Sequence, residues 1–209
     1  MESIGYKVVK APATGEIVEK KSRFIANVIP VSSTAEAEAE IARISKEYWD
    51  ARHNCYAFVI GEKSEITRCS DNGEPSGTAG KPILEVITGA GITNVLIVVT
   101  RYFGGVLLGT GGLVRAYTQA AQAGLASSEI ALMQKAVVIN LKFGYDMINT
   151  VQYYLRQENI HVDKETYEAN VETDIIVPTT DSDKVINDLT QKTNAKIEIN
   201  VTKEDFFAL

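Results

Sequence analysis

In the first 91 residues, some segments have the hydrophobic pattern of strands, and others repeat apolar residues every three or four positions as helices do. Residues 4–31 predict two or three strands. Apolar residues three or four positions apart then predict a helix from Ser33 to about Tyr48, where Ser33 and Glu36 have the spacing of a capping box. Residues 54–61 and 65–70 predict paired strands, and residues 82–91 predict a short helix.

The stretch from Asn94 to Leu125 is predicted to join a strand to a helix through glycines. The apolar run Val95–Val99 predicts a strand buried on both faces, and the alanine-rich residues 113–123 predict a helix that Gly124 ends. Glycine loses more conformational freedom on folding than any other residue, so a glycine cluster needs a reason. It indicates either an anion-binding loop at a helix N-terminus or a tight turn with positive φ angles. The cluster consists of Gly104, Gly105, Gly109, Gly111 and Gly112.

A new pattern begins near Gln134, in the order strand, helix, strand, strand, helix, strand. The six segments are residues 135–143, 145–159, 161–170, 171–178, 181–193 and 195–204. This order is the β-α-β-β-α-β arrangement of a ferredoxin-like sandwich. We therefore expect an α+β chain of two domains, residues 1–130 and residues 134–209.

Composition narrows the class of protein. The chain has 209 residues, of which 45% are hydrophobic and 23% charged, as in ordinary globular proteins. No apolar run approaches the roughly 18–20 residues of a membrane span, and the N-terminus lacks the pattern of a secretory signal. Two cysteines are too few for a disulfide scaffold and fit a reducing compartment. We expect a cytoplasmic protein that does not contact a membrane.

The charge is unevenly distributed. Residues 1–133 carry 13 Lys and Arg against 14 Asp and Glu, whereas residues 134–209 carry 8 against 13. The asymmetry supports two domains. The net charge of −6 argues against nucleic-acid binding by the whole surface, but it is compatible with a local basic site in the first domain.

Standard catalytic and cofactor signatures are missing. His53, Cys55 and Cys69 include no Cys-x-x-Cys pair, so a metal site is not predicted. Residues 77–82 fail the phosphate-loop pattern, which needs Gly at position 75 and Ser or Thr at position 82. Residues 109–114 fail the dinucleotide pattern because Val114 replaces a small residue. We predict no catalytic residue, metal or cofactor, and an enzyme is the less favoured class.

Charged and aromatic residues of the first domain suggest a binding surface instead. Asp71 and Glu74 lie in a turn-rich segment, where carboxylates more often bond to backbone N–H groups than perform chemistry. Arg101, Tyr102 and Phe103 combine a guanidinium with two rings, which can grip phosphate and stack on a base. The same arginine can equally form a salt bridge to Asp71 or Glu74 beside a packed ring.

Three segments resemble the YigZ/IMPACT family: residues 51–61, residues 68–87 and residues 94–121, with RYFGG-x-x-LG-x-GGL as the core. The resemblance covers about residues 21–124. It implies a first domain like the second domain of a small-subunit ribosomal protein, with a mixed sheet and helices on one face. The remainder resembles the second domain of bacterial members, which is similar to a domain of elongation factor G. Eukaryotic relatives carry a different partner domain and regulate translation.

The resemblance implies a translation-linked role, and three hypotheses remain. The first is a protein that binds RNA or the ribosome, the second a regulator that binds another protein, and the third an enzyme or binder of a small phosphorylated ligand at the glycine loop. The oligomeric state is left open. The predicted binding residues are Arg52, Arg68, Asp71, Glu74, Lys81, Arg101, Tyr102, Phe103, Gly104, Gly105, Gly109, Gly111, Gly112 and Arg115.

Overall fold

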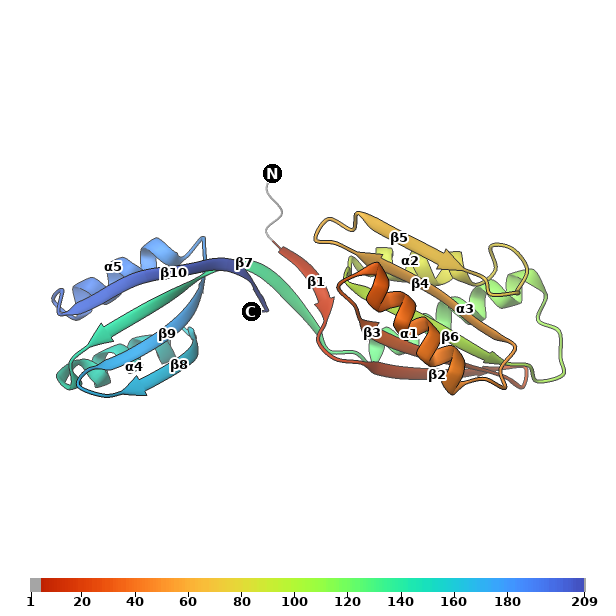
Figure 1. Ribbon diagram of the computed structural model, residues 1–209, viewed down its shortest axis with the longest axis horizontal. Helices are drawn as coiled ribbons and strands as arrows, with labels where there is room; N and C mark the ends of the chain where they lie inside the picture. The colour runs from red at the N-terminus through yellow and green to blue at the C-terminus, as the bar shows by residue number, and fades with distance from the viewer. Residues whose placement is uncertain (1–4, 209) are drawn as a thin grey trace. The chain divides into compact units, whose positions relative to one another are not determined.

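The computed structural model describes residues 5–208 and divides into two compact units, which we treat separately. The first unit, Tyr6–Ala131, contains a five-stranded sheet in the order β2-β3-β6-β4-β5 (Figure 1). Every neighbouring pair in this sheet is antiparallel. The strands are β2 (Ala13–Glu19), β3 (Ser22–Pro30), β4 (His53–Ile60), β5 (Ile66–Ser70) and β6 (Val95–Tyr102).

Helices cover both faces of this sheet. Helix α1 (Thr34–Glu47) lies on one face, whereas α2 (Gly80–Ala90) and α3 (Gly109–Ala126) lie on the other (Figure 1). Strand β6 explains the arrangement, because its alternate residues enter two different cores. Val95, Ile97 and Val99 pack towards α2 and α3, and Leu96 and Val98 pack towards α1.

The expected mixed sheet with helices on one face is therefore wrong in both details. A strand that is apolar at every position needs a cover on each side, which one layer of helices cannot provide. Strand β6 lies between β3 and β4 and is antiparallel to both, so the sheet is not mixed. The α+β class itself is confirmed.

Helix α1 forms where its sequence predicts. The Ser33 hydroxyl accepts a hydrogen bond from the Glu36 N–H at 3.2 Å, as in a capping box. The Glu36 carboxylate accepts hydrogen bonds from the backbone N–H and the hydroxyl of Ser32. The buried residues Ala37 and Ile44 fix the face that α1 turns to the sheet.

Helix α3 is longer than its sequence predicts, and two predictions about its glycines are wrong. It begins at Gly109 rather than Leu113, so Gly111 lies within the helix and not in a loop. It continues through Gly124 to Ala126. Gly124 instead allows close packing, because a Cβ there would lie 2.8 Å from Val28 Cγ2 on β3.

The second unit contains the expected ferredoxin-like arrangement. Its strands follow the order β10-β7-β9-β8 with antiparallel neighbours. Strand β1 (Gly5–Val9) belongs to the first unit except for Gly5. The predicted β-α-β-β-α-β order is confirmed. The elements are β7 (Ile130–Phe143), a 3-10 turn (Tyr145–Met147), α4 (Ile148–Gln157), β8 (His161–Tyr167), β9 (Val171–Pro178), α5 (Ser182–Lys192) and β10 (Ile197–Ala208).

The two faces of the second sheet differ in polarity. Ile139 and Leu141 on β7 pack against Val151 on α4 and Leu189 on α5. On the opposite face, Asn140 donates a hydrogen bond to Asp174 at 2.7 Å, and Lys142 forms an ion pair with Glu172 at 3.3 Å. The helices therefore cover one face of this sheet, and the two polar pairs lie on the other beside the apolar pair Val138–Ile176.

Candidate functional site

Strand register brings four connections of the first unit to one end of its sheet (Figure 1). Arg23 at the start of β3 pairs with Tyr102 at the end of β6, and Arg101 pairs with His53 at the start of β4. We call this region the loop end. It consists of residues 19–22, 48–53, 71–79 and 102–109, and it contains much of the predicted binding surface.

A buried ion pair anchors the loop end. Arg101 Nη1 lies 2.7 Å from Glu74 Oε1, and their side chains are 7% and 4% exposed. The Tyr117 hydroxyl on α3 donates a second hydrogen bond to the same Glu74 oxygen at 2.9 Å. Cys55 Sγ lies 3.3 Å from that hydroxyl. This network ties residues 71–79 to β6, β4 and α3.

Aromatic rings enclose the Arg101 guanidinium. Its central carbon lies 5.5 Å from the centroid of Phe24 and 5.6 Å from that of Phe103, which are cation–π distances. Within residues 5–208, Arg101 Nε is buried and has no hydrogen-bond partner. The sequence left open whether Arg101 grips phosphate or forms a salt bridge beside a packed ring. In the structure it forms the salt bridge, and its guanidinium does not face solvent.

Asp71 organises the backbone of residues 71–80. Its carboxylate accepts hydrogen bonds from the N–H groups of Gly77, Ala79 and Gly80, at 2.8, 2.9 and 2.9 Å. Burial alone would raise the pKa of Asp71, but these three donors hold it below its ordinary value. The carboxylate is thus occupied by its own loop, as expected of an acidic residue in a turn.

The Cys55 thiol and the Tyr117 phenol of the buried network both have raised pKa values and stay protonated. Burial raises the pKa of Cys55 to about 12, so the thiol stays protonated at neutral pH and is a poor nucleophile. Burial also raises the pKa of Tyr117. Within residues 5–208, no three His, Cys, Asp or Glu side chains are grouped to hold a metal ion.

The remaining predicted residues fall in different places. Arg52 is exposed at the loop end, and Arg115 is exposed on the second turn of α3. Lys81 is exposed on α2, 3.9 Å from Glu85. Arg68 lies on the α1 face of the sheet, where it pairs with Glu38 at 2.7 Å and covers the Phe58 ring. Arg68 and Arg101 therefore lie on opposite faces and do not form one surface.

The glycines of the loop end act through close approach and backbone conformation. A Cβ on Gly104 would overlap the backbone of Lys21 in the β2–β3 turn. Gly105 and Gly109 have φ angles of 82° and 70°, which other residues rarely adopt. Their positive φ angles fit the tight turn that the sequence offered as one interpretation. Gly111 and Gly112 lie in the first turn of α3.

Sequence reasoning missed several exposed residues of the loop end. Trp49 is 81% exposed and Leu107 is 84% exposed. Lys20 and Lys21 are exposed in the two-residue turn between β2 and β3. A signal existed for each: Trp49 is the only tryptophan in the chain, and the lysine pair lies between two strand-like segments. What the sequence lacked was the register that brings them together.

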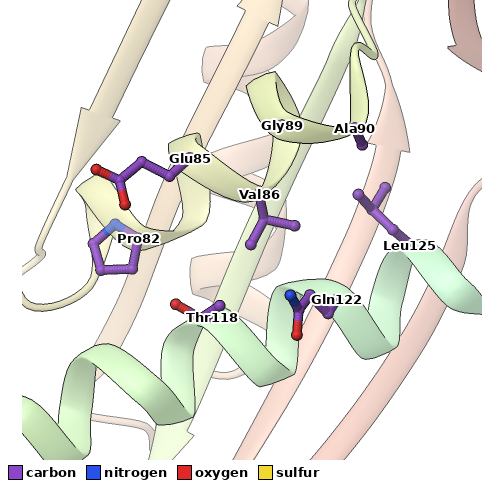
Figure 2. Close-up of a pocket in the computed structure, with 8 residues that line it drawn as sticks. All are labelled: Pro82, Glu85, Val86, Gly89, Ala90, Thr118, Gln122 and Leu125. Atoms are coloured by element: carbon purple, nitrogen blue, oxygen red, sulfur yellow. The ribbon is translucent and has the colours of Figure 1, made fainter.

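A separate pocket of about 430 Å³ lies between α2 and α3 (Figure 2). Val86 and Leu125 line it from the two helices, and Glu85 is the one charged side chain among the eight lining residues shown in Figure 2. None of the predicted binding residues lines this pocket. None of the helices within residues 5–208 combines the length and apolar character needed to cross a bilayer.

The fold and the loop end together define a class of protein. It is a two-domain α+β protein in which a sheet domain with a glycine-rich loop end precedes a ferredoxin-like domain. The family model described as the Impact N-terminal domain matches residues 20–125, and one described as a domain of unknown function matches residues 141–196. The chain belongs to the IMPACT family.

Relatives match across both domains. The chain is 38% identical to the IMPACT family member YvyE of Bacillus subtilis, over 93% of this chain and 89% of YvyE. It is 45% identical to the IMPACT family member YigZ of Escherichia coli, over 56% of this chain and 57% of YigZ. A crystal structure of a hypothetical protein is 30% identical, with a TM-score of 0.62 over 97% of this chain and 100% of the other.

Proposed function

We propose that this chain is a cytosolic, translation-linked binding protein that contacts RNA or the ribosome through its loop end. The observation that carries the proposal is the set of cations exposed there and on the adjacent turn of α3. Within residues 5–208, Lys20, Lys21, Arg52 and Arg115 form no ion pair that would neutralise them. Phosphate binding depends on such cations, since each one releases a counterion from the nucleic acid.

Two of the nearby carboxylates are paired with arginines and do not cancel this positive charge. Glu16 pairs with Arg23 at 2.7 Å, whereas Asp50 accepts a hydrogen bond from the neutral Tyr102 hydroxyl at 2.8 Å and keeps its charge. Glu74 is buried against Arg101. The chain as a whole carries a net charge of −6, so phosphate binding depends on a local group of cations such as this one.

Family membership supports a link to translation. The first domain is 33% identical over 98 residues to mouse Protein IMPACT, which corresponds to 44% of this chain and 30% of the mouse protein. The resemblance that we drew from the sequence implies regulation of translation for eukaryotic members. A protein-binding regulator is the second candidate, because Val106 and Leu107 expose apolar side chains beside the same cations.

Binding or conversion of a small phosphorylated ligand is the least supported of the three functions. The hypothesis needs Asp71 or Glu74 beside a bound phosphate, but both carboxylates are already occupied by hydrogen-bond donors of the chain. The pocket between α2 and α3 offers no cationic side chain to a phosphate.

Binding of purified ribosomes and structured RNA at increasing salt concentration tests the proposal. The double variant Arg52→Ala/Arg115→Ala should bind more weakly, and its dependence on salt should fall by about 0.7–0.9 in logarithmic slope for each lost contact. Arg68→Ala is the control, because Arg68 pairs with Glu38 on the other face of the sheet. Wild-type affinity in the double variant, or no salt-sensitive binding by the wild type, would contradict the proposal.

A further inference from the structure

Two exposed aromatic rings occur among the cations of the loop end. Trp49 follows the last turn of α1 and is 81% exposed, and Phe103 follows β6 and is 51% exposed. One hydrogen bond joins their two segments, because the Tyr102 hydroxyl donates to Asp50 at 2.8 Å. Trp49 and Phe103 are thus each one residue away from this bond.

We infer that Trp49 and Phe103 are two separate stacking positions for the unpaired bases of one RNA single strand, Trp49 beside α1 and Phe103 beside Arg101, and that Lys20, Lys21 and Arg52 hold its phosphates. The inference rests on the proposed function and specifies its ligand. Exposed rings interleaved with unpaired cations are the combination that proteins use on single strands, since every base has a face to stack. In duplex RNA the base faces are inaccessible.

The β2–β3 turn gives an independent reason to assign a function to its lysines. Lys20 and Lys21 have φ angles of 45° and 67°, as in a type I′ turn, where Asn-Gly is strongly preferred. Side chains with a Cβ are strained in this conformation. The turn therefore keeps two cations at positions where a more stable, uncharged pair exists. Strain of this kind clusters at functional sites.

Phe103 is held in place from two sides. Its ring lies over the Arg101 guanidinium, which the Glu74 carboxylate fixes in turn. The next residue, Gly104, packs so closely on Lys21 that a Cβ would overlap the backbone there. The buried network thus positions the aromatic ring and the lysine turn next to each other, and a single strand can contact both.

RNA fits this surface better than a protein partner does, because every nucleotide of a single strand presents both a phosphate and a base face. An acidic protein surface would satisfy the cations, but it offers planar groups only where it carries aromatic, arginine or amide side chains. A protein partner would rely on Val106 and Leu107 and would be insensitive to nuclease. A protein partner is therefore one of the outcomes that the experiment separates.

The only tryptophan in the chain is itself the reporter. We would titrate the full-length protein with an unstructured oligouridine and follow Trp49 emission, while anisotropy of labelled RNA measures binding. Stacking should quench the emission at saturation, and a duplex RNA of equal length should not. Binding of the single strand without a change in Trp49 emission overturns the stacking site but leaves RNA binding intact.

Two variants separate stacking from charge. Trp49→Ala should weaken single-strand binding about 5- to 150-fold without changing the salt dependence, and Trp49→Phe should restore much of the affinity. Lys20→Asn/Lys21→Gly should lower the logarithmic salt slope by about 1.4 while its melting temperature stays equal or rises. Lys63→Asn, in the β4–β5 turn at the other end of the sheet, is the control for charge.

Failure of this inference is distinguishable from failure of the proposed function. Ribosome or duplex binding that survives Trp49→Ala, with no single-strand binding, refutes the stacking site alone. Absence of every salt-sensitive interaction with RNA refutes both. Capture of a protein that survives nuclease treatment and is lost in Trp49→Ala assigns the surface to a protein partner instead.

Discussion

Arg101 shows how one residue of a sequence motif can serve the fold rather than the ligand. It is buried, paired with Glu74 and enclosed by Phe24 and Phe103. A buried charge that loses its partner is costly, because the remaining charge has neither water nor a counterion. The buried guanidinium therefore stabilises the loop end, and only the exposed residues around it can contact a ligand.

We predict that Arg101→Ala destabilises the protein by about 3–5 kcal/mol, because Glu74 is left buried without its cation. Arg68→Ala, which breaks an ion pair whose side chains are 51% and 58% exposed, should cost less than about 1 kcal/mol. Urea denaturation measures both. Equal losses of stability would show that the Arg101 pair is no stronger than a surface pair.

Asp71 leads to a prediction about pH. Its pKa in the folded protein lies below the ordinary value, so its contribution to stability is present above the unfolded pKa of about 3.9 and is lost as the pH falls through the folded pKa. Asp71→Asn should lower stability by about 1–3 kcal/mol at pH 7, since the amide cannot accept all three hydrogen bonds. The gap between variant and wild type should narrow as the pH falls below the unfolded pKa of about 3.9.

Denaturation of both proteins at several pH values provides the measurement for Asp71. A gap that stays constant down to acidic pH would mean that the ionised carboxylate is not what holds residues 77–80. Thr78→Ser is a suitable control, because it keeps the hydroxyl that donates to the Pro75 carbonyl at 2.6 Å and carries no charge.

Residue identities alone could have predicted part of this site. Asp71 behaves as an acidic residue in a turn usually does, and the Arg101–Glu74 pair was one of two interpretations that the sequence allowed. The choice between them depends on which way Arg101 points from β6. That direction follows from the register with β3 and β4, which no local pattern encodes.

At the scale of elements, helix α3 packs on the sheet through glycine. Gly124 lies so close to β3 that a Cβ would be 2.8 Å from Val28 Cγ2 and 3.1 Å from Ala26 Cβ. Contacts of this length force backbone or side chains to shift. The residue expected to end the helix is instead the one that lets the helix approach its sheet.

We predict that Gly124→Ala destabilises the protein by about 1–3 kcal/mol through overpacking. Gly111→Ala, in the first turn of the same helix, should stabilise it by about 0.5 kcal/mol. A Cβ at Gly111 would meet only Arg115 Nη1, at 3.8 Å. Thermal unfolding of the two variants checks the contrast, and a stabilising Gly124→Ala would contradict the close packing.

Most elements could be predicted from periodicity, whereas their limits could not. The glycines of α3 illustrate the reason. Helix propensity disfavours Gly109, Gly111, Gly112 and Gly124. Packing of Leu113 at one end and Leu125 at the other into the first core overrides that preference and accompanies the extension at both ends. Tertiary contacts of this kind are invisible to a local window.

At the scale of the whole molecule, the chain has separate hydrophobic cores in its two units. The clusters around β6 contain no residue of the cluster around β7 and β9. The order of elements from β7 to β10 sufficed to predict the ferredoxin-like topology. It did not suffice for the first sheet, since the insertion of β6 between β3 and β4 is not encoded in the order of elements.

We predict two calorimetric unfolding transitions, one for each unit. Ile97→Ala removes a fully buried side chain from the first core, and Leu141→Ala removes one from the second. Each should cost about 2–5 kcal/mol and should lower the midpoint of one transition only. A single transition that both variants lower by equal amounts would show that the units unfold together.

The central position of β6 has a consequence for how the first unit is made. Strands β3 and β4 flank β6, but β6 begins only at Val95, 35 residues after β4 ends at Ile60. As the nascent chain leaves the ribosome, the edges of β3 and β4 that pair with β6 therefore stay unpaired until their common neighbour has been made. The order of synthesis delays collapse of this core until β6 has emerged, and such a delay exposes surface that chaperones bind.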